Sequence, residues 1–376
     1  ESAPACIAAA RLSREPTGAI TSNSDIFPFM GANLLILFVT LRNMKKILLY
    51  ISVSLALISC GRPSKQTVEK NPFITDVMLK TTPVKDQGHS QLCWAYAMLA
   101  TIETNHLMIG DSVNLSTDYI ARMMLNNASI RYYLSGGKNA ISMRGMGCLL
   151  IHLMQDYGIV PFDSYNAKEP ANYNVICRKL MQATKSANNL STLNQKVNDI
   201  LDEEVGYMPS KYVHMLGAEY TPQEFARSVC RDDEYINVTS FKHHVMGDSF
   251  ILETPDNVMN DKFVNVPIET LMSMITKSIV KGKAVCWEGD ITESGFSFNN
   301  GIAETNHHIV TQDLRQHEFE SRQTTDDHTM ELVGLAHNKN GKKYFIAKNS
   351  WGTGNRFNGY MYLSYNYVKL KTIAVF

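Results

Sequence analysis

The kind of secondary structure that the sequence predicts changes along the chain, and this change is the strongest constraint on the fold. Apolar residues at helical spacing predict a helix at 92–106, and further helices are predicted at 146–157, 222–229 and 267–281. The segment 175–204 is long and polar, and its composition is largely helical. The last third has β-branched and aromatic runs between Gly and Asn turns, which predict strands at 284–287, 330–336, 344–348 and 360–364. Helices first and strands later, without βαβ alternation, predict an α+β fold.

Composition excludes several classes of protein. The chain has 376 residues with 36 Lys and Arg against 36 Asp and Glu, so it lacks the excess positive charge of a general nucleic-acid binder. An apolar fraction of 44% argues against disorder over most of the chain. Seven cysteines are too few for a disulfide scaffold of this length. We therefore expect a globular protein with no nucleic-acid partner.

A secretion-like segment stands before the globular part. Met44, Lys45 and Lys46 are followed by a mostly apolar stretch at 47–58 and then by Cys60. A basic start, a short apolar core and a small-residue exit are the three parts of a secretory signal, and a cysteine at the exit is similar to a bacterial lipobox. We expect Cys60 to be acylated and to hold the protein at the membrane of the cell envelope, on its periplasmic side or outer surface.

This interpretation divides the chain into an upstream extension, a lipoprotein signal peptide, a polar tether and a folded domain, at 1–43, 44–59, 60–72 and 73–376. The alternative is a transmembrane helix over 34–59. Three basic residues between 42 and 46 would then lie inside the span, where charges are costly. Each separate apolar run is also shorter than the roughly 20 residues that a span needs. The sequence therefore favours the lipid anchor.

The strongest chemical signal is a cysteine at the entrance of a predicted helix, because Cys93 and Trp94 follow a turn-like segment at 83–92. Helix N-termini present unpaired N–H groups and a positive dipole end, and both favour a thiolate. Gln87, six residues earlier, is placed to return beside the sulfur and donate its side-chain N–H to an oxyanion. A lone cysteine of this kind is more often a core residue, so the interpretation depends on partners elsewhere.

Such partners occur near the end of the sequence. His328 opens one predicted strand, and the sequence Asn-Ser-Trp-Gly at 349–352 closes the next. The short Gly/Asn connection at 338–341 predicts a hairpin that brings His328 to Asn349. An imidazole can take a thiol proton, and an asparagine side chain can fix the tautomer of the ring. Asp327 is expected to be solvated and without a chemical role.

These separated motifs, in this order, resemble the papain-like cysteine peptidases. The resemblance implies a two-lobe α+β fold with a helical lobe, a β-rich lobe and the active site between them. It implies that Cys93 is the nucleophile, that His328 is the general base and acid, and that Asn349 orients His328. Gln87 would share the oxyanion hole with the backbone N–H of Cys93. Trp351 would shield the contact between Asn349 and His328, and it is also a candidate substrate-binding residue. Peptides or proteins are then the substrates.

The sequence resembles one branch of that family more closely, the bleomycin hydrolases and aminopeptidases C. The separation of 235 residues between Cys93 and His328 leaves room for the insertion of that branch, which we expect to be largely helical at about 165–280. Ser90 also fits the branch, since secreted papains carry a disulfide cysteine there. Further similar segments occur at 157–161, 221–225, 267–281 and 282–287. The branch often forms hexamers, but nothing else in this sequence supports an oligomer.

The sequence departs from the branch at three places. Gln91 stands where glycine is usual, two residues before the nucleophile. Arg144 and Gly145 stand where a Gly-Gly pair usually lines the cleft wall and bonds the substrate backbone, so both are candidate substrate-binding residues. The branch also extends a C-terminal arm that binds the substrate's amine, whereas Phe376 lies about where the last family strand ends. We therefore leave open whether the protein is an aminopeptidase or an endopeptidase.

Gln91 and Arg144 also motivate an alternative to an enzyme, a non-catalytic peptide-binding lipoprotein on the same fold. A complete set of Cys, His, Asn and Gln favours the peptidase.

We expect no metal and no cofactor. The histidine pairs at 243–244 and 307–308 would point to opposite faces of a strand and make poor joint ligands. Four further cysteines can either pair in an oxidising compartment or remain free, at Cys148, Cys177, Cys230 and Cys286.

Overall fold

The computed structural model describes residues 71–138, 140–167, 171–208, 211–215 and 217–376. The predicted signal peptide, Cys60 and nearly all of the predicted tether lie outside these residues. The described part forms one unit, Asn71–Phe376. Within it, no helix combines the length and apolar character needed to cross a bilayer.

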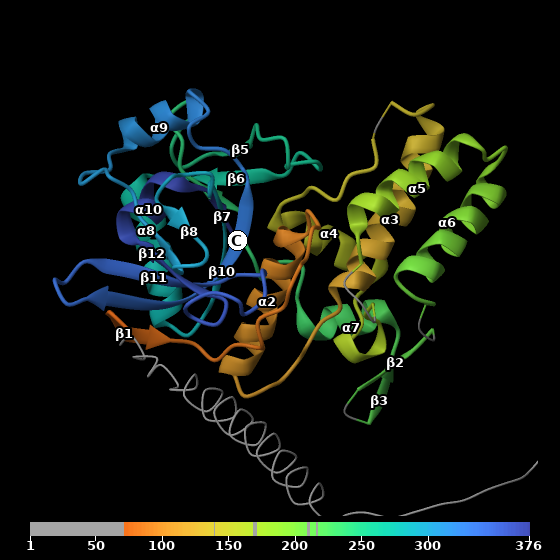
Figure 1. Cartoon of the computed structure of the whole chain (residues 1–376), viewed down its shortest axis with the longest axis horizontal. Coiled ribbons are helices and arrows are strands. Elements are labelled where there is room, and N and C mark those ends of the chain that lie inside the picture. The colour runs from red at the N-terminus through yellow and green to blue at the C-terminus, as the bar shows by residue number, and fades with distance from the viewer. Residues whose placement is uncertain (1–70, 139, 168–170, 209–210, 216) are drawn as a thin grey trace, which may run out of the picture. The chain divides into compact units, whose positions relative to one another are not determined.

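One half of this unit is built on a large mixed sheet (Figure 1). In the described residues its strands follow the order β5-β6-β4-β13-β7-β10-β11-β12-β9-β8. Strand β1 pairs with the second half of β10, beyond the stretch that pairs with β7. A separate small hairpin joins β2 to β3. The strands are β1 (Phe73–Met78), β2 (Val213–Met215), β3 (Ala218–Tyr220), β4 (Val238–Thr239), β5 (Ser249–Ile251), β6 (Lys262–Asn265), β7 (Val285–Gly289), β8 (Phe296–Ser297), β9 (Ile302–Ala303), β10 (His328–Asn338), β11 (Lys343–Lys348), β12 (Tyr360–Ser364) and β13 (Thr372–Val375).

The other half is helical, with α3, α5 and α6 on the side away from the sheet (Figure 1). Helix α2 lies between the halves and packs against β10 and β7 on one side and α4 on the other. The helices are α2 (Cys93–Met108), α3 (Thr117–Leu134), α4 (Gly147–Tyr157), the short 3₁₀ turn η1 (Phe162–Ser164), α5 (Tyr173–Lys185), α6 (Leu190–Glu204), α7 (Pro222–Val229), α8 (Ile268–Val280), α9 (Gln312–Glu320) and α10 (Tyr365–Lys371). This arrangement confirms the predicted α+β fold with a helical half and a β-rich half.

The predicted hairpin is present in β10 and β11. Glu331 pairs with Lys348 across the two antiparallel strands. Asn338 N–H donates to the carbonyl of Lys342 at 2.9 Å and closes the turn. Because His328 begins β10 and Asn349 directly follows β11, the register brings both residues to the same end of the hairpin.

The helices predicted at 92–106, 146–157, 222–229 and 267–281 are present as α2, α4, α7 and α8. The predicted helix at 222–229 is α7, which Thr221 and Glu224 begin with a reciprocal capping box. The segment at 175–204, predicted to be largely helical, contains two helices, because the chain breaks after Lys185 and the Asn189 side chain caps a second helix by accepting the N–H of Thr192. Helix α3 was not predicted, since buried polar residues such as Arg122 interrupt its apolar pattern.

A buried carboxylate ties the segment before α2 to the helix itself. Glu103 is fully buried and accepts hydrogen bonds from the Thr82 hydroxyl at 2.5 Å and from the Leu115 N–H at 2.7 Å. It also pairs with Lys85 at 2.8 Å. A buried charge is stable only when it is paired and hydrogen-bonded, so these contacts fix the 82–85 segment on α2. Gln87 follows directly from that segment.

Candidate active site

Cys93 is the first residue of α2 and is only partly exposed. No side chain caps this end of the helix, so the N–H groups of its first turn stay available to the sulfur and to a ligand. The N–H of Trp94 and both the backbone and the hydroxyl of Thr329 hydrogen-bond to the sulfur and lower its pKa. Because Thr329 directly follows His328, these bonds join the start of α2 to the start of β10.

Burial outweighs these stabilising bonds at the sulfur. Desolvation, followed by the charge of Glu288, raises the pKa of the Cys93 thiol to about 11. The expected lowering by the helix N-terminus is therefore present but is not the dominant effect. In the free protein the thiol is protonated at neutral pH, and the thiolate has to form by transfer of the proton within the site.

His328 and Asn349 meet as predicted. Asn349 Oδ1 lies 2.8 Å from His328 Nε2. The same oxygen accepts the N–H of Ser350 at 2.7 Å, which identifies it as the acceptor and makes His328 Nε2 the donor. The neutral ring therefore carries its proton on Nε2, and Nδ1 is left as the basic nitrogen. Burial lowers the pKa of His328 to about 4, and the bond to Asn349 opposes this effect.

Trp351 covers this pair. Its ring centroid lies 4.7 Å from that of His328, at an interplanar angle of 37°. Phe296 and Phe298 pack edge-on against Trp351 at centroid distances of 6.0 and 5.2 Å. These contacts give Trp351 the shielding position that the resemblance implies. Its expected role in binding substrate stays a prediction.

Gln87 is buried and its amide is held at both ends. Its Oε1 accepts the Ser350 hydroxyl at 2.6 Å, and its Nε2 donates to the Ser90 carbonyl at 2.8 Å. Its backbone N–H donates to the Ser350 carbonyl at 2.8 Å. The Nε2 group has two hydrogens, so one remains to be offered to an oxyanion. Ser350, which the sequence analysis did not single out, joins Gln87 to the loop that carries Asn349.

Gly145 and Trp94 form the wall of the site on the helical side. The Trp94 indole donates to the Met143 carbonyl at 2.9 Å. A Cβ added to Gly145 would lie 2.5 Å from Leu149 Cδ2 and 3.1 Å from Trp94 Cε2, so a side chain here would require Leu149 to move and would press on Trp94. This close approach explains the glycine by packing, whether or not Gly145 also contacts substrate.

Arg144 reaches from that wall to the β-rich half. Its Nε lies 2.5 Å from Asp256 Oδ1, and its guanidinium lies 4.0 Å from Asp326 Oδ1. The side chain is 45% exposed, so it remains accessible to solvent while paired. Asp256 precedes β6, and Asp326 precedes β10 by two residues.

A group of carboxylates beside the nucleophile was not predicted from the sequence. Carboxylate oxygens of Asp256, Glu288 and Asp326 all lie within 4.8 Å of one another. Desolvation raises the pKa of Asp256 to about 6 and also raises the pKa of Asp326 and of Glu288. The sequence does contain a signal for this cluster, because the acidic Glu288 continues the apolar strand 284–287 and an acidic pair stands at 326–327.

A second titratable group is formed by His243, His244 and Glu253. The expectation that adjacent histidines diverge is wrong, because residues 243–244 lie in a turn and both Nε2 atoms contact Glu253, at 3.2 and 2.6 Å. Gln316 Nε2 donates to His243 Nδ1, so His243 carries its proton on Nε2 and has no lone pair there for a metal. The remaining cysteines among the described residues are free and buried, at Cys148, Cys177, Cys230 and Cys286.

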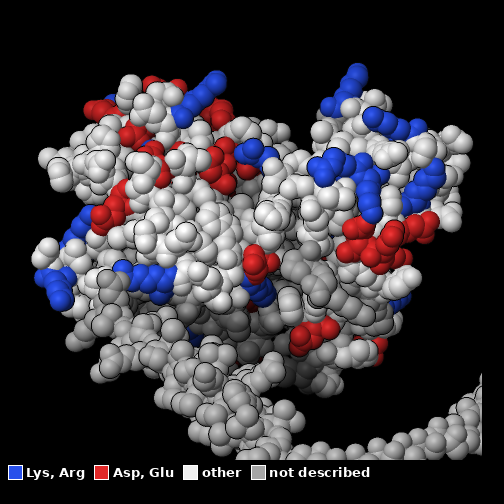
Figure 2. Space-filling model, viewed as in Figure 1, with Lys and Arg blue, Asp and Glu red and all other residues white. Residues whose placement is uncertain are grey.

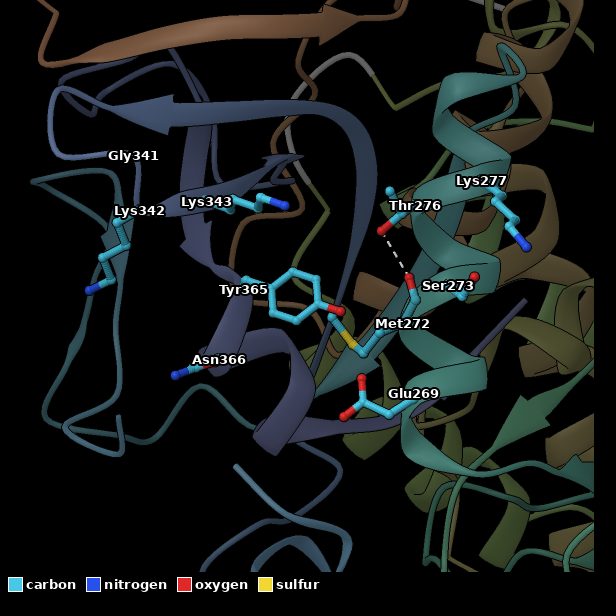
Figure 3. Close-up of a pocket in the computed structure, with 10 residues that line it drawn as sticks. All are labelled: Glu269, Met272, Ser273, Thr276, Lys277, Gly341, Lys342, Lys343, Tyr365 and Asn366. Carbon is cyan, nitrogen blue, oxygen red and sulfur yellow. Dashed lines mark hydrogen bonds between the residues drawn. The ribbon is translucent and has the colours of Figure 1, made fainter. Parts of the chain in front are cut away.

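The described surface is notched between the half with the sheet and the half with α3, α5 and α6 (Figure 2). Gln87 borders a pocket of about 550 Å³ that extends to Phe162 and Tyr173. Another pocket, of about 810 Å³, lies between α8, the β10–β11 turn and the start of α10 (Figure 3). It is lined by Glu269, Lys277, Lys342 and Tyr365 among others and includes no residue of the candidate active site.

Comparison with known proteins agrees with this geometry. Residues 204–373 match the Peptidase C1-like family. Aminopeptidase G of Lactobacillus delbrueckii subsp. lactis is 26% identical over 147 residues, which cover 36% of this chain and about a third, 33%, of the length of that relative.

Solved structures extend the comparison to nearly the whole chain. PepW of Lactobacillus rhamnosis superposes with a TM-score of 0.62 and 17% identity, covering 93% of this chain and 92% of that one. Digestive procathepsin L 3 of Tenebrio molitor gives a TM-score of 0.40 and 16% identity, over 82% of this chain and 71% of that one. The chain therefore has the papain-like fold, and residues 204–373 are similar to the Peptidase C1-like family.

Proposed function

We propose that this protein hydrolyses peptide bonds through a Cys–His–Asn mechanism and is related to the bleomycin hydrolase and aminopeptidase C branch. The observation that carries the proposal is the 2.8 Å hydrogen bond from His328 Nε2 to Asn349 Oδ1, which leaves His328 Nδ1 free to act as a base. The next residue on β10, Thr329, hydrogen-bonds to the Cys93 sulfur. The position of Cys93 at an uncapped helix N-terminus and the held amide of Gln87 support the same conclusion.

The proposed reaction begins with a neutral pair. The Cys93 proton moves to His328 Nδ1, and the sulfur electron pair attacks the substrate carbonyl carbon to form a C–S bond. The carbonyl electrons move to oxygen, and Gln87 Nε2 and the N–H at the start of α2 stabilise this oxyanion. The C–N bond then breaks, and the departing amine takes the proton from His328.

Water completes the cycle. It attacks the thioester carbonyl while His328 Nδ1 takes its proton, and the second oxyanion faces the same donors. The C–S bond breaks, the acid product leaves, and the proton on His328 returns to the sulfur. Because burial disfavours each charge separately, the thiolate and imidazolium form together, at the moment when each stabilises the other.

The test is covalent labelling combined with a peptide digest. An epoxysuccinyl inhibitor of the E-64 type is expected to modify Cys93, which peptide mapping identifies. Cys93→Ala is expected to lose both the label and cleavage of a peptide library. Cys177→Ala removes a buried free thiol on α5 and is the control that keeps both properties. A folded wild-type protein that is neither labelled nor active contradicts the proposal.

A non-catalytic peptide-binding protein is the second candidate, and the raised pKa of the Cys93 thiol is the observation that favours it. It predicts peptide binding that Cys93→Ala leaves unchanged, with no turnover by either protein. The labelling experiment separates the two functions, because a thiol that never ionises in the site does not open an epoxide.

We also propose that a lipid on Cys60 holds the enzyme at the bacterial cell envelope. The support is the sequence alone, with a basic start at 44–46, an apolar core at 47–58 and the cysteine that follows. Expression in a bacterial host is expected to give a membrane-fraction protein whose N-terminal peptide carries acyl chains. Cys60→Ala is expected to remove the lipid and release the protein. A wild-type protein without acyl groups contradicts this proposal.

A further inference from the structure

The carboxylates beside the nucleophile have too little positive charge around them. Asp256, Glu288 and Asp326 come from three separate segments, yet their oxygens lie within 4.8 Å of one another. In the described part of the chain, the ion pairs that reach them come from one side chain, Arg144, which bonds Asp256 and lies 4.0 Å from Asp326. Like charges this close raise one another's pKa unless a cation lies between them.

Glu288 is the least satisfied of the three carboxylates. The residue is only 2% exposed, and its Oε2 has no hydrogen-bond partner among the described residues. The other two carboxylates are better supported, since Asp256 N–H donates to Asp326 Oδ2 at 3.0 Å and Arg144 holds Asp256. A buried carboxylate oxygen without a partner is costly, so Glu288 is positioned for a donor that the chain does not itself supply.

This carboxylate cluster lies next to the nucleophile. Glu288 pairs with Thr329 across β7 and β10, and Thr329 hydrogen-bonds to the Cys93 sulfur. The charge of Glu288 acts on the Cys93 thiol directly. A group bound to the cluster therefore lies near the start of α2, where Cys93 attacks the substrate carbonyl.

The position of His328 decides which side of the substrate reaches the cluster. His328 gives its proton to the leaving amine, so the residues after the scissile bond lie toward His328 and its neighbours Asn349 and Trp351. The carboxylate cluster lies instead toward Arg144 and the wall formed by Gly145. The residues before the scissile bond consequently face the carboxylates.

We propose that Asp256, Glu288 and Asp326 form a subsite for a cationic group of the substrate on the amino-terminal side of the scissile bond. This inference rests on the proposed peptidase function. An ammonium or guanidinium group donates several hydrogen bonds and fits an acceptor-only pocket. A hard metal ion such as Ca²⁺ fits less well, because it takes six to eight oxygen ligands and the cluster already shares its oxygens with Arg144.

Binding of this cation also assists the chemistry. The charge of Glu288 raises the pKa of the Cys93 thiol, so a cation that neutralises Glu288 favours the thiolate. The groups facing the sulfur are Glu288 and Cys286 on β7, Thr329 on β10 and the N–H of Trp94 on α2. Among these, Glu288 is the charged group that a substrate cation can neutralise.

Two sources supply such a cation, a free α-ammonium group or a basic side chain, and matched substrates distinguish them. The first pair is a neutral dipeptide amide of aminomethylcoumarin with a free and with an acetylated N-terminus. The second pair is acetylated, with lysine or norleucine before the residue that is cleaved. We expect one cationic member to be preferred by about 10- to 100-fold in kcat/KM, the range for a buried charge-assisted hydrogen bond.

Glu288→Gln tests the cluster itself. It is expected to remove most of that preference while cleavage of the neutral substrates and E-64-type labelling of Cys93 persist. Asp313→Asn removes an exposed carboxylate on α9 and is the control that keeps the preference. A wild type that cleaves both members of each pair equally, or a Glu288→Gln variant that keeps the full preference, overturns the proposal.

Binding without turnover separates this inference from the proposed function. Cys93→Ala is expected to bind the cationic peptides more tightly than their neutral partners by isothermal titration calorimetry, and adding Glu288→Gln is expected to abolish the difference. Absence of labelling and of all cleavage in the wild type contradicts the peptidase function alone. Labelling and cleavage with no cation preference in either assay contradict the subsite alone.

Discussion

The two sides of the active site are built on opposite principles. On the side of His328, the side chains are held in place by partners, since Asn349 fixes the ring and Ser350 fixes both Asn349 and Gln87. On the side of Glu288, three carboxylates crowd together with one shared guanidinium. We call the side of His328, Asn349, Ser350 and Gln87 the satisfied side, because its hydrogen bonds position atoms for chemistry. The side of Glu288, Asp256 and Asp326 is the carboxylate side, and its excess negative charge positions it for a ligand. Substitutions on the side of His328 should therefore lower the rate of catalysis, whereas substitutions on the side of Glu288 should change the preference for cationic substrates.

Removing the base has the largest expected effect on the satisfied side. His328→Ala is expected to lower kcat/KM by about 10³-fold or more, because no other group takes the thiol proton. The measurement is steady-state hydrolysis of a neutral coumarin peptide, with circular dichroism to show that the fold persists. His308→Ala, at an exposed histidine, is the control and should retain full activity. Activity within tenfold of wild type in His328→Ala would assign the base to another residue.

Gln87 is expected to have the next largest effect. Gln87→Ala removes the oxyanion donor and is expected to lower kcat by roughly 10²- to 10³-fold, the range for one such donor. KM should change little, since the bond forms in the transition state. Gln91→Ala, four residues along the same segment and exposed, is the matched control. A loss carried by KM, with kcat unchanged, would show that Gln87 binds substrate instead.

Asn349 acts through His328, so its effect is smaller. Asn349→Ala leaves the imidazole free to rotate and to change tautomer, and we expect a loss of about 10- to 100-fold in kcat. Asn349→Gln should restore part of it if the side chain works by hydrogen bonding. A purely structural role predicts that both variants lose thermal stability and that the glutamine restores no activity.

The sequence predicted the satisfied side well because each of its parts depends on local patterns. A Gly/Asn turn sets the register of β10 and β11, and that register alone brings His328 to Asn349. Likewise, Cys93 begins α2 where the apolar spacing begins. The roles of these residues came from the resemblance, and the structure added the tautomer of His328 and the contacts that hold Gln87.

The carboxylate side was not predicted because it depends on long-range contacts. Asp256, Glu288 and Asp326 lie at least 32 residues from one another in sequence, and only the pairing of β7 with β10 and the path of the 252–261 loop bring them together. The raised pKa of Cys93 was missed for the same reason. Helix-terminus reasoning is local, whereas burial and the charge of Glu288 come from the packing of β7 and β10 against α2.

The smallest expected effect tests the link between the two sides. Glu288→Gln removes a negative charge that raises the pKa of the Cys93 thiol, so it must lower that pKa. Alkylation of Cys93 by iodoacetamide follows the thiolate, and its pH midpoint is expected to fall from about 11 by roughly one unit, or 1.4 kcal/mol. Glu304→Gln, at a carboxylate paired with Lys342 on the surface, should leave the midpoint unchanged. If the midpoint of Cys93 alkylation is unchanged in Glu288→Gln, the carboxylates and the nucleophile are electrostatically independent. The thiolate would then form on the side of His328 without help from the carboxylates that bind the cation.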